Sequence, residues 1–60
     1  MYQMYYVTVW VSRKKTETFV VMADRHALIT EGGKQMRVFY INNVPVETFE
    51  ESEIVKLEEA

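Results

Sequence analysis

HALITEGGKQMRVFYI, residues 26–41, predicts a β-hairpin whose loop is Gly32-Gly33. A two-residue hairpin loop of type I′ or II′ needs positive φ, and glycine adopts positive φ without steric cost. With these two glycines as the loop, Glu31 lies opposite Lys34, and the numbers of opposed residues sum to 65. A slip of one residue would move every side chain to the other face, so the loop predicts one register.

This register divides the hairpin into two faces, because directly opposed residues share a face of a sheet. One face is wholly apolar and consists of Ala27, Ile29, Met36 and Val38. The other face is mixed and consists of His26, Leu28, Thr30, Gln35, Arg37 and Phe39.

A second turn is predicted at Asn42-Asn43, because asparagine tolerates the left-handed region. Its register opposes Ile41 to Val44 and Phe39 to Val46. The apolar side chains of this hairpin lie on the face opposite to Val38, so strand 35–41 needs burial on both faces. A bent strand in a small barrel, or a sheet covered on both sides, meets that need. Pro45 lacks a backbone N–H, which predicts that strand 44–48 lies at a sheet edge or has its amide side unpaired.

Two further strands are predicted before the hairpin, because residues 2–12 and 16–23 are rich in β-branched and aromatic side chains. The first strand directs Tyr5, Val7, Val9 and Val11 to the core and Tyr2, Met4, Tyr6, Thr8 and Trp10 to the other side. The second directs Phe19, Val21 and Ala23 one way and Val20 and Met22 the other. The connection, Arg13-Lys14-Lys15, contains neither glycine nor asparagine, so the register between the two strands stays open.

The C-terminal segment fits two structures. Thr48 and Glu51 have the spacing of a capping box, and Phe49, Ile54 and Leu57 would share one broad helical face. We therefore expect a short helix over residues 49–58. The alternative is a strand over 53–58, in which Ile54 and Lys56 alternate with Val55 and Leu57.

Together these elements predict a single mainly-β domain over residues 1–60. We expect a small five-stranded antiparallel sheet, or a partly open SH3-like barrel, with a short C-terminal helix. So short a chain buries only about 60% of the surface that its unfolded state exposes. Because its strands are apolar on both sides, we expect it to form a homo-oligomer.

Composition gives little support to catalysis, a cofactor or a metal site. The chain has no cysteine and one histidine, and His26 has no nucleophile among its expected neighbours on the sheet. We expect a non-catalytic protein without a cofactor. The N-terminal residues lack the order of a signal peptide and no apolar run reaches 18 residues, so we expect a cytoplasmic protein with no membrane span.

Charge is unevenly distributed although the net charge is only −2. Residues 1–41 carry six basic and three acidic side chains, or +3, whereas residues 42–60 carry one lysine and six glutamates, or −5. Such asymmetry can reflect internal ion pairs, a partner surface or a solvated segment.

The functional expectation is a small binding module that acts by protein–protein interaction, as a regulator, an inhibitor or a subunit. Tyr2, Tyr6 and Trp10 are the candidate partner-binding residues, because tyrosine and tryptophan often anchor interfaces. Length and composition also resemble those of small accessory proteins of phages, which is an analogy and not a motif. The alternative is a small β-barrel that binds single-stranded nucleic acid through aromatic and basic side chains. Its candidate residues are Trp10, Arg13, Lys14, Lys15, Arg37 and Phe39.

Overall fold

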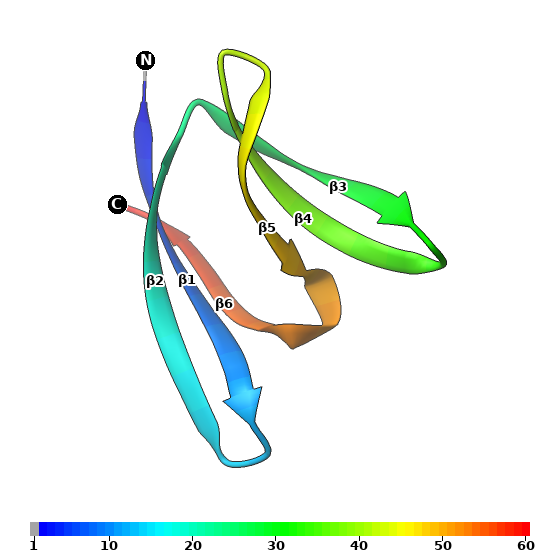
Figure 1. Cartoon of the computed structure of the whole chain (residues 1–60). Coiled ribbons are helices and arrows are strands. Elements are labelled where there is room, and N and C mark those ends of the chain that lie inside the picture. The colour runs from blue at the N-terminus through cyan, green and yellow to red at the C-terminus, as the bar shows by residue number, and fades with distance from the viewer. Residues whose placement is uncertain (1) are drawn as a thin grey trace.

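A computed structural model describes residues 2–60 as six β-strands in two antiparallel sheets (Figure 1). The strands are β1 (Gln3–Ser12), β2 (Lys15–Ala23), β3 (Arg25–Glu31), β4 (Lys34–Ile41), β5 (Val44–Glu50) and β6 (Ile54–Glu59). The strand orders are β2-β1-β6 in one sheet and β3-β4-β5 in the other. The mainly-β prediction is confirmed. The prediction of one five-stranded sheet is wrong, because the chain forms two three-stranded sheets, and these do not close into a barrel.

The glycine hairpin has the predicted register. Gly32 and Gly33 both have positive φ, 57° and 79°, and the pairing runs without a shift from Glu31↔Lys34 to Arg25↔Tyr40. Asn42 and Asn43 also adopt positive φ, 50° and 65°, and Ile41 pairs with Val44 as expected.

The second hairpin departs from its predicted register after two pairs. Tyr40 pairs with Pro45, but Phe39 pairs with Glu47 and not with Val46. Val46 is therefore the extra residue of a β-bulge, and it lies next to a proline that cannot donate a ladder hydrogen bond. As Pro45 predicted, β5 is an edge strand.

The predicted C-terminal helix is wrong. A three-residue 3₁₀ turn, η1 (Glu51–Glu53), follows β5 and leads into the strand β6. Val9 pairs with Ile54 and Thr8 with Lys56, so Val55 is the extra residue of another bulge. Because of this bulge, Ile54 and Leu57 both pack against the core although they are three residues apart. Residues at this spacing also share one face of a helix, which is why the sequence pattern predicted a helix here.

The first hairpin turns at Arg13-Lys14 without positive φ at either residue. A turn of this kind does not match the twist of the strands as the primed turns do. The register shifts between Trp10 and Ser12 and leaves Val11 unpaired. Val11 is consequently exposed, and the prediction that it belongs to the core is wrong.

The hydrophobic core lies between the inner faces of the two sheets. Sheet β2-β1-β6 contributes five buried side chains: Tyr5, Val7, Val9, Val21 and Ala23. The opposite sheet contributes Phe39, which is fully buried and whose ring centroid lies 5.3 Å from that of Tyr5 and 5.9 Å from that of Phe49. The mixed face of the glycine hairpin therefore faces this core. Val38, on the other face of β4, is also buried, so burial on both faces of this strand is confirmed.

A polar corner connects the two sheets where β2 passes into β3, close to the β4–β5 turn (Figure 1). The Asp24 N–H donates to the Tyr40 carbonyl at 2.8 Å, and the Asn42 N–H donates to Asp24 Oδ2 at 2.7 Å. The Arg25 guanidinium donates to Asn43 Oδ1 at 3.2 Å and lies 4.1 Å above the Tyr40 ring. These contacts hold the asparagine turn against the start of β3.

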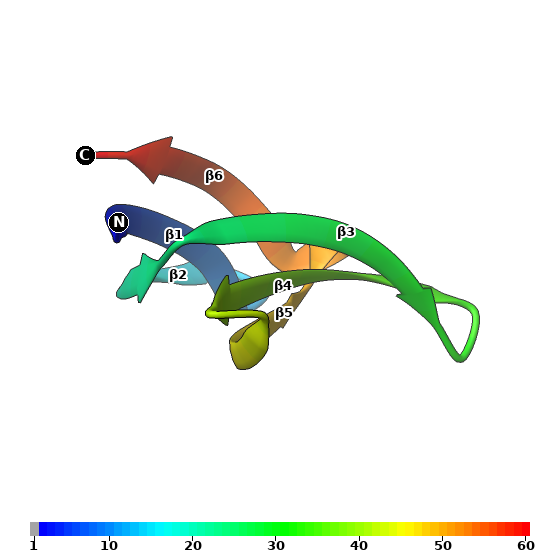
Figure 2. The same ribbon diagram turned by 90° about the horizontal axis from the view of Figure 1, so that it is seen from above.

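The molecule is thin, as the view from above shows (Figure 2). Its Cα atoms span 35 × 28 × 13 Å, which leaves no room for a third layer. Within residues 2–60, no helix has the length and apolar character to cross a membrane.

Candidate functional site

Large apolar side chains gather on the outer face of sheet β2-β1-β6. The register Met4↔Met22, Tyr6↔Val20, Thr8↔Thr18 and Trp10↔Thr16 places these residues on one face, opposite to the core. Five of them are 37–59% exposed and form what we term the apolar patch: Met4, Tyr6, Trp10, Val20 and Met22.

The patch rests on a well-anchored strand. Along β1 the outward side chains alternate with Tyr5, Val7 and Val9, which are buried in the core. β1 is also the central strand of its sheet, and the hydroxyls of Thr8 and Thr18 are hydrogen-bonded at 2.8 Å in the middle of the outer face. The apolar patch is therefore presented by regular, paired strands and not by a loop.

The two sides of the patch differ. On the β6 side, Lys56 and Glu58 lie opposite Thr8 and Tyr6 and form an ion pair of 2.8 Å. The hydrogen bond from Lys56 to Glu58 raises the pKa of the lysine. On the other side the sheet ends at β2. The outer face thus has one charged border and one border made by an edge strand.

Of the three predicted partner-binding residues, Tyr6 and Trp10 belong to the apolar patch. Tyr2 is exposed and lies just before β1 begins. Val20 and Met22 were not among the predicted site residues, because the register between β1 and β2 could not be derived from the sequence.

The residues of the alternative nucleic-acid site lie in separate places. Arg13, Lys14 and Lys15 are exposed at the β1–β2 turn, at the same end of β1 as Trp10. Arg37 and Phe39 belong to the other sheet. Phe39 has no exposed surface on which a base could stack.

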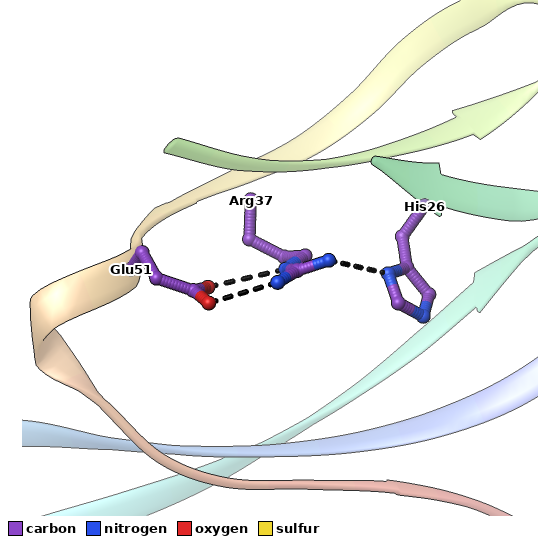
Figure 3. Close-up of polar contacts among 3 residues, drawn as sticks. All are labelled: His26, Arg37 and Glu51. Carbon is purple, nitrogen blue, oxygen red and sulfur yellow. Dashed lines mark hydrogen bonds and ion pairs between the residues drawn. The ribbon is translucent and has the colours of Figure 1, made fainter. Parts of the chain in front are cut away.

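A second set of side chains comes together on the inner side of sheet β3-β4-β5, and we term it the polar cluster: His26, Arg37 and Glu51 (Figure 3). The Arg37 guanidinium donates two hydrogen bonds to Glu51, Nε to Oε1 at 3.1 Å and Nη2 to Oε2 at 2.8 Å. Its Nη1 donates to Nδ1 of His26 at 3.2 Å. Such a fork is among the stronger hydrogen-bonding arrangements of proteins. It ties β3 and β4 to η1, the link between the two sheets.

The polar cluster shifts the acidity of its members. Burial lowers the pKa of His26, and the Arg37 charge lowers it further. The hydrogen bond from Arg37 lowers the pKa of Glu51. Because Arg37 can only donate, Nδ1 of His26 accepts, so the proton of the neutral ring is on Nε2. The ring also packs against Tyr5 and Phe39, each at a centroid distance of 5.2 Å. His26 therefore lies at the edge of the core, as a half-buried strand histidine.

Sequence reasoning missed the Arg37–Glu51 pair because it assigned Glu51 to the first turn of a helix. The signal that could have found it is the charge asymmetry of the chain. Glu50 and Glu51 of the acidic segment 42–60 form ion pairs with Lys34 and Arg37 of the basic part of the chain. Internal pairing thus accounts for part of that asymmetry.

A shallow cleft of about 340 Å³ lies beside the polar cluster, lined by Gly33, Lys34, Gln35, Glu50, Glu51 and Ser52. The Lys34–Glu50 ion pair of 3.3 Å belongs to its wall. Across residues 2–60, no three histidine, aspartate or glutamate side chains are grouped so that they could hold a metal ion. Comparisons of this chain with protein-family models, with curated proteins and with solved structures found no match.

Proposed function

We propose that this chain is a small binding module whose apolar patch binds another protein. The observation that carries the proposal is the clustering of Met4, Tyr6, Trp10, Val20 and Met22 on one exposed sheet face. Contiguous exposed apolar surface is costly in water, and on folded proteins it commonly marks an interaction site. No element within residues 2–60 covers this face.

The chemistry of the patch favours a protein partner. Tyrosine and tryptophan supply large, rigid contact areas and are enriched among interface hot spots, and methionine adapts to irregular surfaces. Trp10, at 45% exposure, has its ring available to a partner while its backbone is paired with β2. The backbone that carries the ring is thus already ordered before a partner binds.

A second candidate function, binding of single-stranded nucleic acid, is favoured by one observation. Trp10 is exposed at the same end of β1 as the basic turn Arg13–Lys15, and bases stack on aromatic side chains beside basic groups. Against this, Lys56 and Glu58 neutralise each other along the other border of the sheet, and Arg37 is occupied by Glu51.

Affinity capture with wild-type and Trp10→Ala baits separates these functions when protein and nucleic acid are analysed in the same eluate. The proposed function predicts one stoichiometric protein that the wild type retains and Trp10→Ala loses, with an affinity loss of about 2 kcal/mol or more. Val44→Ala is the control, because Val44 is an exposed apolar residue on β5, outside the patch.

Two outcomes would contradict the proposal. The first is nucleic acid alone in the eluate, lost both with Trp10→Ala and with a Lys14→Ala/Lys15→Ala bait. The second is a protein partner that all baits retain equally. Thermal unfolding of each bait shows whether Trp10→Ala keeps the wild-type fold.

A further inference from the structure

The apolar patch contains the two most exposed methionines that the structure describes, Met4 and Met22. They are directly opposed on β1 and β2, with exposures of 37% and 44%, and both lie on the face opposite to the core. On its other side, Met4 has Ala60 as neighbour, whose N–H donates to the Met4 carbonyl at 2.8 Å. Met22 lies on the edge strand β2. Within residues 2–60, the two thioethers thus flank each other, and across the sheet only a methyl group lies beside them.

Met36 is in a different environment. It lies on the central strand β4, where Ile29 and Glu50 are its directly opposed neighbours, and it is less exposed than Met4 or Met22. An oxidant must reach a sulfur atom in order to react with it, so the rate of oxidation follows exposure. We therefore expect Met4 and Met22 to oxidise faster than Met36.

Methionine is the only sulfur-containing residue type of this chain, which has four methionines and no cysteine. An oxidant that would react with a cysteine thiolate in another protein therefore reacts with a thioether here. Apolar area alone does not require methionine on this face, since valine and isoleucine are also apolar and have stronger strand preferences. What methionine adds is flexibility and a sulfur atom that can be oxidised and reduced again.

We propose that Met4 and Met22 form an oxidation site that controls the apolar patch, with hydrogen peroxide as the oxidant. In each reaction the O–O bond of the peroxide breaks, one oxygen atom bonds to the thioether sulfur, and the other leaves as water. The sulfur loses two electrons and the peroxide gains them. A thiol-dependent reductase reverses the reaction, because two thiols are oxidised to a disulfide while the sulfoxide oxygen leaves as water.

Oxidation at this site changes the patch and leaves the core intact. A sulfoxide is polar, and covering it with an apolar partner surface that offers no hydrogen bond is unfavourable. The two sulfoxides lie next to the Tyr6–Val20 pair, so this end of the patch becomes polar, whereas Trp10 lies beyond the Thr8–Thr18 pair at the other end. Oxidation should consequently release the bound protein. This inference rests on the proposed function, which supplies the protein that is released.

Treatment of the folded protein with hydrogen peroxide, followed by its removal with catalase, tests the inference. Peptide mapping by mass spectrometry should show Met4 and Met22 oxidised several-fold faster than Met36. The oxidised wild type should elute earlier from a butyl hydrophobic-interaction column, and methionine sulfoxide reductases should restore the original elution. Its affinity for the protein that the untreated bait captures should fall at least about tenfold.

Met4→Leu/Met22→Leu is the matched variant, because leucine keeps the patch apolar and does not react with peroxide. Its elution and its capture of the partner should be the same before and after treatment. Met36→Leu should respond to peroxide as the wild type does. All variants keep Met1, so its oxidation affects them equally, and circular dichroism shows that each oxidised protein is folded.

Failure of the proposed function is visible before peroxide is added, when Trp10→Ala captures the partner as well as the wild type does. The inference is overturned if the oxidised wild type keeps its column retention or its partner, or if Met4→Leu/Met22→Leu responds to peroxide as the wild type does. Oxidation of Met36 as fast as that of Met4 and Met22 would equally overturn it. Column retention requires no partner, so it decides the inference even where the proposed function fails.

Discussion

At the scale of single residues, Arg37 joins parts of the chain that the turns alone do not connect. It lies on the central strand β4, and its guanidinium reaches Glu51 in η1 and His26 in β3. The Arg37 side chain is 19% exposed and that of Glu51 33% exposed, so water screens their interaction only in part. Removing Arg37 would leave the Glu51 carboxylate without both of these hydrogen bonds, and removing Glu51 would leave Arg37 with only its bond to His26.

Glu51→Ala should therefore lower the free energy of unfolding by about 1–3 kcal/mol, because Arg37 loses two hydrogen bonds. Glu53→Ala is the matched control, since Glu53 is an exposed glutamate of the same 3₁₀ turn, and its effect should stay within about 0.5 kcal/mol. Urea denaturation of both variants measures the difference. Equal stabilities of the two variants would show that the Arg37–Glu51 fork contributes nothing.

Acid should destabilise the protein through His26. Burial and Arg37 hold the pKa of this ring below its ordinary value of 6.5, so the unfolded chain takes up the proton first. The contribution of neutral His26 to the free energy of unfolding is fully present above pH 6.5. It is lost as the pH falls through 6.5 toward the pKa of His26 in the folded protein. Glu51 and Glu59 oppose this shift, and Arg37 reinforces it. Glu51, whose own pKa is lowered, adds a further loss below its ordinary value of 4.5.

His26→Gln isolates the histidine contribution, because glutamine is similar in size, can accept from Arg37 and does not titrate. Denaturation at about pH 7.5 and about pH 5.5 should show the wild type losing more stability than His26→Gln on acidification. The same loss in both proteins would mean that His26 is not responsible.

At the scale of elements, local turn chemistry was predictable and bulges were not. Gly32-Gly33 determined the whole register of β3 and β4, and Asn42-Asn43 determined the first two pairs of the next hairpin. Alternation along β1 correctly directed Tyr6 and Trp10 away from the core. The same alternation failed at Val11 in β1, and the register predicted for the second hairpin failed at Val46 in β5. These two residues, and Val55 in β6, are 41–49% exposed. Each is the extra residue of a bulge, and nothing in valine itself marks it as unpaired.

The sheet orders predict where backbone hydrogen bonds persist longest. β1 and β4 are central strands and are bonded on both sides, whereas β2 is bonded on one side along its exposed part. Amide hydrogen exchange in dilute protein should thus be slowest in β1 and β4 and faster in Lys15–Val20. Exchange in β4 as fast as in β6 would contradict the strand orders.

At the scale of the whole molecule, a flat chain of 60 residues has more apolar sheet surface than it can cover by itself. One face of sheet β2-β1-β6 is buried in the core, and the other carries the apolar patch. We expect the apolar patch to be the surface that binds the partner.

Oxidative footprinting of the captured complex tests most directly whether a partner covers the apolar patch. Exposed methionine oxidises readily to the sulfoxide, so Met4 and Met22 report on the patch while Met36, in the other sheet, is an internal reference. We predict that Met4 and Met22 oxidise several-fold more slowly in the complex than in the free protein, and that Met36 is unchanged. Equal oxidation of Met4 and Met22 in the free and bound protein would contradict the assignment of this face as the binding surface.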